Sequence, residues 1–528
     1  MKFNPIIFYT VIVSLGGFIF GFDASVVSGT IGQITTEFAL SPLDQGLVVA
    51  APTLGAIIST LTAGYISDRI GRRTTLMIIA ALYLVSALAS AFAPTYDALV
   101  VARFIGGLAF CSLMIAPMYI AEISPAKSRG KMVSVNQLNI VVGFSAAYFA
   151  NYYILNLSQQ SLDWVADIHL DTQTWRWMLG VEIIPALLYF LCLFLIPKSP
   201  RWLVVQNRED DAKMVLKRLY PDAEAATLSA NIQEIKDTLD DKLKPVLERV
   251  GEIFGPNVRK ALFIGLIVGI AQQATGVNVI YFYAPSIFEQ SGVGTNAAFA
   301  QAIWIGLTNV VFTVVAMVLI DRLGRKPLLI AGLTGVIVSM AICTYGYNQA
   351  SYLLTQDSIA ALASSFDSQP LIGLVDQTFQ NDVDFKNAVI SALGEETFQA
   401  NQGAIIQQAV SMNAFLVLFG ILLFVASFAV SLGPVMWVMF SEIFPNHLRG
   451  LAISVVGVVN SIVSFTVQLV FPWELANLGA AFTFAVYGIF ALIGLVFVIK
   501  MVPETKGKSL EDIEQELVYG DNQLKEKT

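Results

Sequence analysis

An acidic side chain, Asp23, lies inside an apolar segment, in which residues 5–22 read PIIFYTVIVSLGGFIFGF and carry no charge. An ionised side chain at the centre of a bilayer costs about 2.5–3.5 kcal/mol on insertion scales, so its presence there indicates a function. Arg103 is the basic residue that lies well inside an apolar segment, and we expect it to pair with Asp23. An arginine within about 4–6 Å keeps an aspartate ionised, and its departure favours the protonated form. The pair is suited to proton uptake and release, and the alternative is a static structural ion pair.

The composition indicates a membrane environment for these charges. The 528 residues are 56% hydrophobic and 13% charged, with a mean hydropathy of +0.68 and a net charge of −8, whereas soluble domains are about 25% charged. Cys111, Cys192 and Cys343 all lie in apolar segments, which argues against a disulfide framework and a thiolate metal site. The apolar N-terminal segment is too long for the hydrophobic region of a signal peptide, so we interpret it as a membrane span.

Segments of about 20 apolar residues are long enough to cross the hydrocarbon core, which is roughly 30 Å thick. Segments this continuously apolar are expected to be helices, because a helix satisfies its backbone hydrogen bonds internally. The sequence predicts an all-α membrane protein with twelve spans, at residues 6–28, 46–66, 75–93, 98–121, 133–155, 177–197, 261–284, 299–320, 327–347, 412–440, 450–472 and 479–501.

Lysine and arginine are distributed unequally between the two sides of these spans. Of 31 such residues, Arg103 lies well inside a span, and Arg176 and Lys386 lie in connections that follow odd-numbered spans. The other 28 lie at the termini, in connections that follow even-numbered spans or, for Lys500, at the C-terminal end of the last span. Because cytoplasmic loops carry the excess of positive charge, both termini are predicted to be cytoplasmic.

Two long connections divide the chain. Residues 198–260 are charged and helix-patterned, and we interpret them as a cytoplasmic linker of short amphipathic helices. Residues 348–411 form an acidic outer insertion with helical segments such as DFKNAVISALGEETF, and either a lid or a partner-binding insertion fits this composition. The predicted organisation is an N-terminal six-helix bundle (1–197), the linker (198–260), a C-terminal six-helix bundle (261–501) that contains the insertion, and a cytoplasmic tail (502–528).

The two halves repeat three charged motifs. GYISDRIGRR (64–73) corresponds to DRLGRK (321–326), EISPAKSRG (122–130) to EIFPNHLRG (442–450), and PKSPR (197–201) to PETKG (503–507). Such a repeat implies two bundles with a cavity near the midplane between them. Ion pairs among these motifs could lock the bundles together at the inner face, and the alternative is that the arginines only mark topology. The predicted gating residues are Asp68, Arg69, Arg72, Arg73, Glu122, Arg129, Arg201, Asp321, Arg322, Arg325, Glu442 and Arg449.

Together with GGFIFGFD, RFIGG, PKSPRWL, QQATGVN and GPVMWVMFSEIFPNHLRG, these motifs resemble the sugar porter family of the major facilitator superfamily. The resemblance covers the chain except the insertion, and the pattern is most similar to that of bacterial sugar–proton symporters such as those for xylose. It implies two six-helix bundles that work by alternating access. The positions that match the family's sugar-contacting residues are Gln137, Gln272, Gln273, Asn278, Asn309, Trp437 and Asn460.

The chemistry of these side chains agrees with the resemblance. Amides donate and accept hydrogen bonds, which suits the hydroxyls of a neutral sugar, and an aromatic face covers its C–H surface. The alternative is that the amides hold helices together. Because Gln273 and Asn278 are five residues apart, we expect the helix to be loosened at Thr275–Gly276.

The resemblance also assigns roles to acidic groups. In proton-coupled members the pair that corresponds to Asp23 and Arg103 is implicated in coupling, and Glu182 matches a glutamate of relatives, for which a structural and a proton-path role are both open. Two positions depart from the family pattern. Phe282 replaces a frequent Tyr and Ser461 a frequent Trp, so we expect a roomier pocket near the eleventh span.

We therefore expect a proton-coupled symporter that imports a neutral monosaccharide, a hexose such as glucose or else xylose. The alternatives are a facilitative uniporter of the same fold and a sugar sensor, against which the short tail after Lys500 argues. An enzyme is not expected, because His169 and His447 lie in connections on opposite sides. The expected coupling ion is the proton, and neither a cofactor nor a nucleic acid is expected. We expect a monomer that is surrounded by lipid in a bacterial inner membrane.

Overall fold

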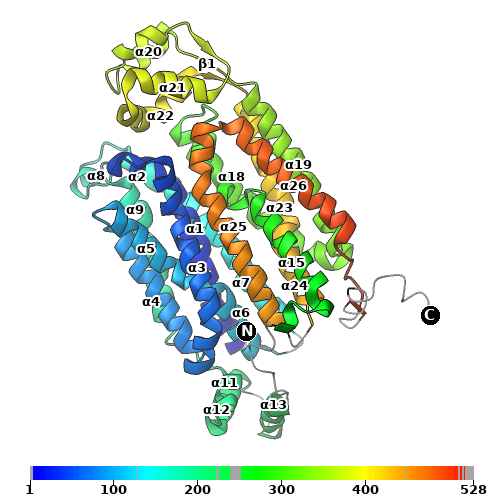
Figure 1. Cartoon of the computed structure of the whole chain (residues 1–528). Helices are drawn as coiled ribbons and strands as arrows, with labels where there is room; N and C mark the ends of the chain where they lie inside the picture. Colours follow the sequence, from blue (N-terminus) through cyan, green and yellow to red (C-terminus); the bar gives the residue numbers. More distant parts are fainter. Residues whose placement is uncertain are drawn as a thin grey trace. The chain divides into compact units, whose positions relative to one another are not determined.

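In the computed structural model, residues 4–125, 128–221, 225–237, 251–445, 448–508, 512–513 and 517 are described. Twelve helical segments in this part of the chain are long and apolar enough to cross a membrane, which confirms the predicted number of spans. The helices of the first half are α1 (Pro5–Val26), η1 (Val27–Gly29), α2 (Ile31–Phe38), α3 (Pro42–Ile70), α4 (Arg72–Ala91), α5 (Tyr96–Leu108), η2 (Ala109–Cys111), α6 (Ser112–Ile123), α7 (Arg129–Ser158), α8 (Asp163–Asp167), α9 (Thr174–Gly180) and α10 (Ile183–Cys192) (Figure 1).

The linker contains short helices, as predicted. They are α11 (Pro200–Val205), α12 (Glu209–Leu219) and α13 (Ala225–Asp237), and residues 238–250 of the linker lie outside the described part. Acidic residues begin α12 and basic residues end it, an order that favours the helix because it complements the helix dipole. The membrane helices of the second half are α15 (Pro256–Ala274), α16 (Val277–Phe282), α17 (Ala284–Glu289), α18 (Thr295–Leu323), α19 (Arg325–Asn348), α23 (Ala414–Val430), α24 (Leu432–Ile443), α25 (Arg449–Asn477) and α26 (Ala480–Met501).

Several spans are interrupted, and these breaks position the functional side chains. Spans one, four, seven and ten are broken after α1, α5, α15 and α23, so the break recurs in every third span. In span seven the break is at Thr275–Gly276, as predicted, and Gly276 has a φ of +84°. A side chain at this position is disfavoured by the positive φ. It would also clash with a neighbour, because a Cβ would lie 2.7 Å from the Tyr487 ring. Span six is also interrupted, at the turn between α9 and α10 that contains Glu182.

The insertion between α19 and α23 is a small folded module. It contains β1 (Ser351–Leu353), α20 (Gln356–Leu362), η3 (Gln369–Leu374), β2 (Thr378–Phe379), α21 (Asp382–Leu393), α22 (Glu395–Ala409) and β3 (Val410–Ser411). The sheet has the order β2-β1-β3 and is antiparallel, with Tyr352 opposite Phe379 and Val410. A separate hydrophobic core forms around buried Tyr352, Phe385 and Val389. The predicted helical segment is confirmed, whereas the sheet departs from the all-α expectation.

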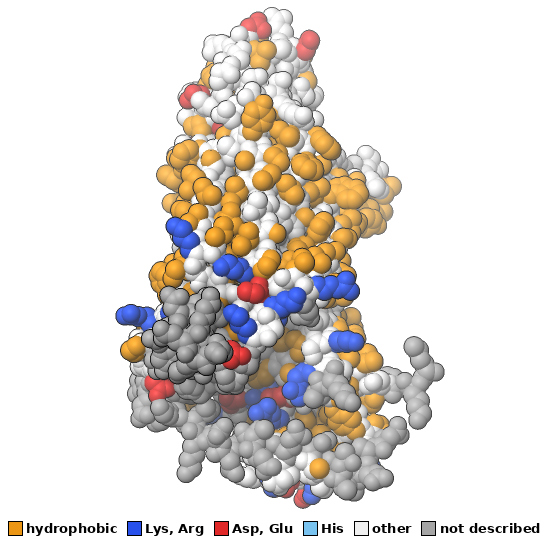
Figure 2. All heavy atoms as spheres, turned by 90° about the vertical axis from the view of Figure 1, so that its right-hand side faces the viewer, with side chains coloured by type: hydrophobic (Ala, Val, Ile, Leu, Met, Phe, Trp, Pro, Cys, Tyr) orange, Lys and Arg blue, Asp and Glu red, His pale blue; other side chains and the backbone are white. Residues whose placement is uncertain are grey.

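The described chain divides into two compact units that cut across the expected bundles. One unit comprises residues 1–23, 51–144 and 180–250, and the other comprises 24–50, 145–179 and 251–528. We call them the first and the second unit. The division into two six-helix bundles remains a prediction. On the face seen in Figure 2, hydrophobic side chains form a broad band, and lysine and arginine gather next to one edge of it.

Candidate transport site

The first unit contains a buried cluster of three charged groups. Asp23 of α1 and Arg103 of α5 form an ion pair, and each side chain is 2% exposed. The Arg103 Nη2 also donates to the Asp23 carbonyl oxygen over 3.3 Å. Because each charge lowers the cost of burying the other, the pair that the sequence predicts is physically reasonable inside the bilayer.

Glu182 adds a second carboxyl to this cluster. It is 2% exposed and interacts electrostatically with both Asp23 and Arg103. Two carboxyl groups bond to each other only when one of them carries a proton, because an ionised carboxylate has no donor. Two acids that interact with one arginine are therefore a candidate site for holding and releasing a proton.

The second unit contains a connected network of amides on α15, α16 and α25. Gln273 Nε2 donates to Asn460 Oδ1 over 3.2 Å, and Asn278 Nδ2 donates to Gln273 Oε1 over 3.0 Å. Asn460 Nδ2 donates to Gln272 Oε1 over 2.9 Å, and Gln272 Nε2 donates to the Leu432 carbonyl of α24 over 3.1 Å. Four of the predicted sugar-contacting residues are thus brought together. These amides satisfy one another, so a sugar would have to exchange these bonds for its own.

Two further polar residues extend the network. Ser464 Oγ accepts from Asn278 Nδ2 over 2.6 Å and from Gln468 Nε2 over 2.7 Å. Both residues lie on α25, and both are buried. The sequence analysis did not identify them. A signal was present, because Asn460, Ser464 and Gln468 are spaced by four residues and therefore lie on one face of the helix.

The remaining predicted contact residues are not hydrogen-bonded to this network in the described structure. Asn309 on α18 is 5% exposed and accepts from Thr313 Oγ1 over 3.5 Å. Trp437 on α24 is 45% exposed and packs edge-on against Phe440, with 5.8 Å between ring centroids. Gln137 lies on α7 in the first unit with an exposed side chain. An exposed aromatic face within a span is available for contact with a ligand.

The two residues that depart from the family pattern, Phe282 and Ser461, both lie in the second unit. Phe282 is 8% exposed at the end of α16, and Ser461 is partly buried on α25, next to Asn460. The expected widening of the pocket near Ser461 remains a prediction.

The charged motif of the first half forms a local ion-pair cluster. Arg72 Nε donates to Glu122 Oε1 over 3.0 Å, and Arg72 Nη1 lies 2.8 Å from Asp68 Oδ1. Ser199 Oγ donates to Glu122 Oε2 over 2.5 Å. These contacts connect the start of α4, the end of α6 and the segment before α11.

The same arrangement recurs in the second half. Arg325 Nη2 donates to Glu442 Oε1 over 2.7 Å, and Thr505 Oγ1 donates to Glu442 Oε2 over 2.6 Å. Burial raises the pKa of Glu504, but hydrogen bonds from the backbone N–H groups of Lys506, Arg325, Lys326 and Thr505 outweigh it, so this pKa lies below its usual value. An arginine, a glutamate and a hydroxyl thus take equivalent places in both halves. Ion pairs between the halves remain a prediction.

The other predicted gating residues have separate positions. Arg69 donates to Tyr65 over 3.1 Å, Arg73 donates to the Phe194 carbonyl over 2.9 Å, and the Arg322 carbonyl accepts from Lys506 over 2.6 Å. Arg129 and Arg201 are exposed, and Arg449 is partly buried. Asp321 is in α18, but its side chain lies outside the described part, as does His447.

Twelve spans, recurrent helix breaks, a buried acid–arginine cluster and a separate amide network define a multi-pass membrane transporter. The chain belongs to the sugar transporter family of the major facilitator superfamily. The family described as "Sugar (and other) transporter" matches residues 9–366 and 392–517, which leaves out part of the folded insertion.

Curated relatives are similar over almost the whole chain. The D-xylose-proton symporter of Escherichia coli (strain K12) is 33% identical, covering 96% of this chain and 94% of the relative. The arabinose-proton symporter of Bacillus subtilis (strain 168) is 32% identical, covering 95% and 92%. The glucose transporter GlcP of Staphylococcus epidermidis is 30% identical, covering 98% of each chain.

Solved structures of the E. coli xylose transporter XylE are also similar. Its inward open conformation matches with a TM-score of 0.72 at 30% identity, covering 96% of this chain and 99% of that chain. Its partially occluded inward open conformation matches with a TM-score of 0.70, also at 30% identity, covering 96% and 99%.

Proposed function

We propose that this protein is a proton-coupled symporter that imports a neutral monosaccharide by alternating access. The observation that carries the proposal is the cluster of Asp23, Arg103 and Glu182, because a facilitator has no need to bury two acids beside one arginine. The amide network and the printed names of the relatives, which include xylose and arabinose symporters, support a sugar as the substrate. A hexose such as glucose or a pentose such as xylose fits the same chemistry.

The coupling follows from the residues of the two sites. While Arg103 is paired with Asp23, each charge lowers the cost of burying the other; a proton that binds to Asp23 removes this attraction and frees Arg103 to pair with Glu182. A sugar that replaces the bonds among Gln273, Asn278 and Asn460 favours one arrangement of the helices that carry them. If this arrangement also favours protonated Asp23, proton and sugar increase each other's affinity by linkage. No other cofactor enters this scheme.

Contacts within the second unit support a state that is closed on the side of the connections that follow odd-numbered spans. Tyr148 donates to the Tyr281 carbonyl over 2.5 Å, and Gln159 and Asn296 exchange hydrogen bonds of 2.9–3.0 Å. In each contact, a residue in the C-terminal half of span five or directly after it bonds to the second half of the chain. From the positive-inside distribution we infer that this side is the outer one, and we propose a state that is closed there, with both termini cytoplasmic and the protein, as a monomer, in a bacterial inner membrane.

The proposal is tested with purified protein in liposomes, by uptake of labelled glucose, xylose and arabinose with and without an inward proton gradient. We expect one of these sugars to accumulate above equilibrium only with the gradient, and a protonophore to abolish the accumulation. Uptake that stops at equilibrium in both conditions would identify a uniporter. Absence of uptake for all three sugars would refute the substrate class.

A further inference from the structure

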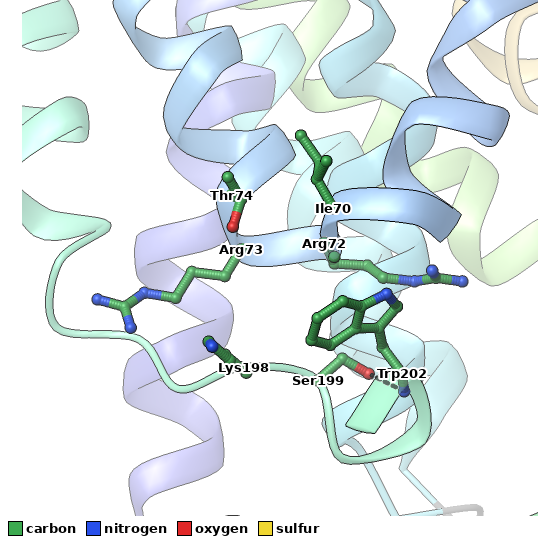
Figure 3. Close-up of a pocket in the computed structure, with 8 residues that line it drawn as sticks. Ile70, Arg72, Arg73, Thr74, Lys198, Ser199 and Trp202 are labelled. Carbon is green, nitrogen blue, oxygen red and sulfur yellow. Dashed lines mark hydrogen bonds between the residues drawn. The ribbon is translucent and has the colours of Figure 1, made fainter. Parts of the chain in front are cut away.

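A basic groove lies on the first unit, at the end of span six. It has a volume of about 340 Å³ and is bordered by the start of α4, the segment after α10 and one side of α12. The residues on which the argument depends are Arg73, Lys198, Arg208, Asp211, Met214 and Arg218. A smaller hollow adjoins it, and Figure 3 shows Arg73 and Lys198 on one side of that hollow and Trp202 on the other.

Three of the four cations in the groove have no carboxylate partner within the described part of the chain. Arg208 is neutralised by Asp211, with 2.5 Å between the charged atoms. Arg73 donates to the Phe194 carbonyl over 2.9 Å, and Arg218 donates to the Leu195 carbonyl over 3.3 Å. The Arg73 Nε is buried and has no hydrogen-bond acceptor among the described residues. The groove therefore offers unneutralised positive charge to an anion.

The groove is continuous with a surface that is suited to hydrocarbon. Ile184, Leu188 and Leu191 are 69%, 53% and 55% exposed, and their spacing places them on one face of α10. Leu195, which follows the helix, is 50% exposed. This apolar stripe runs along α10 to the carbonyls that Arg73 and Arg218 bind. Met214, at the edge of the groove, is 65% exposed. Apolar surface thus leads directly to a cluster of cations at the expected depth of the lipid headgroups.

We propose that this groove binds an anionic phospholipid. The phosphate lies between Arg73, Lys198 and Arg218, and an acyl chain lies along the exposed face of α10. Arginine suits this role because its planar group donates two parallel hydrogen bonds to phosphate oxygens. Basic pockets at the membrane surface select anionic headgroups over zwitterionic ones by charge. The proposal concerns the surface of the first unit and is independent of which sugar is transported.

The test measures lipid binding to the full-length protein in detergent by native mass spectrometry. The probes are phosphatidylglycerol, phosphatidylcholine and, as a soluble phosphate ester, glycerol 3-phosphate. The test variant is Lys198→Gln/Arg218→Gln. The matched control is Lys213→Gln/Lys217→Gln, which removes two exposed cations of the same helix, α12, that do not line the groove. Sugar binding is measured in all proteins to show that they are folded.

We expect one phosphatidylglycerol to bind tightly to the wild type and to the control variant. In the test variant its affinity should fall roughly 30-fold, because each cation near an anionic lipid contributes about fivefold. Equal affinity for phosphatidylcholine would refute recognition of the charge. Equal competition by glycerol 3-phosphate would refute a lipid as the source of the phosphate. An equal loss in the control variant would refute a defined site.

Discussion

At the scale of single residues, Asn278 has a central position in the amide network. Its Nδ2 donates to both Gln273 and Ser464, so it joins the two ends of the network across the break in span seven. A sugar hydroxyl that binds here competes with bonds that are already made. Geometry of this kind favours ligands with several hydroxyls over ligands with one, because several bonds must be replaced together.

Replacing Asn278 by alanine should weaken sugar binding roughly 10- to 100-fold, because the sugar then loses the hydrogen bonds that this amide would make to its hydroxyls. The measurement is isothermal titration of the purified variant with the transported sugar. Asn477→Ala is the matched control, since the Asn477 amide donates to the Trp473 carbonyl of its own helix. An affinity for Asn278→Ala as high as for Asn477→Ala would contradict the assignment.

The contacts and helix breaks of some of these residues could be predicted from the sequence, and those of others could not. The charges Asp23 and Arg103 could be paired because few ionised groups lie in apolar segments. The distortion at Thr275–Gly276 could be predicted because glycine accepts a positive φ. Ser464 was missed, because a serine within a span often bonds only to its own helix. Its bond to Asn278 depends on how α16 packs on α25, which no local pattern specifies.

At the scale of elements, the inserted module is attached to the membrane helices by polar contacts. Asp382 of α21 accepts from Lys386 over 3.1 Å and from the backbone N–H of Ala480 over 3.3 Å, at the start of α26. Helix α22 of the inserted module packs against α2 and α17. The module is therefore held against elements of both halves of the chain within the second unit.

A carboxyl at this attachment should make stability depend on pH. Glu289 ends α17 beneath α22, where a Cβ on Gly403 would lie 4.0 Å from the Glu289 Cδ. Burial raises the pKa of Glu289 from 4.5 to about 7, although a hydrogen bond with Thr295 lowers it. The folded state then binds this proton more tightly than the unfolded state does. Stability is therefore lost as pH rises from about 4.5 to about 7 and is constant above that range.

Replacing Glu289 by glutamine should remove this dependence and stabilise the protein at pH 8, by about 3 kcal/mol at most. The measurement is the thermal unfolding of both proteins between pH 5 and pH 8. Glu396→Gln, at an exposed position of α22, is the control. Parallel curves for wild type and Glu289→Gln over this range would show that Glu289 does not titrate there.

The element pattern shows where the sequence was insufficient. The twelve spans follow from hydropathy, because every backbone group in lipid must be satisfied within a helix. The breaks in spans one, four and ten were not predicted, since the apolar sequence continues through them. The sheet of the insertion was also missed. Strands of two or three residues are too short to show alternation, and their pairing joins residues as distant as Ser351 and Ser411.

At the scale of the whole molecule, alternating access requires the contacts within the second unit to break and re-form. Gln159 follows α7 and Asn296 lies near the start of α18, and their side chains bond to each other. If the outer side opens during each cycle, this bond must separate. A covalent link at the same place should therefore stop transport without preventing folding.

The variant Gln159→Cys/Asn296→Cys should lose at least about nine tenths of its transport activity once a short bismaleimide joins the two cysteines. The link would prevent the outer side from opening, which blocks the transport cycle. The measurement is sugar uptake before and after the reagent, with each single-cysteine variant as a control for modification alone. Full activity in the linked protein would show that these two residues need not separate, and would contradict the proposed closed state.

The central claim is that Asp23 couples proton and sugar movement, and Asp23→Asn tests it most directly. The variant should fold, because Glu182 remains beside Arg103 as a second carboxylate. Labelled sugar is followed in liposomes by two assays, counterflow without a gradient and accumulation with an inward proton gradient. The account predicts that the variant exchanges sugar in counterflow but does not accumulate it, while the wild type does both. Accumulation by Asp23→Asn to the wild-type level would contradict the account.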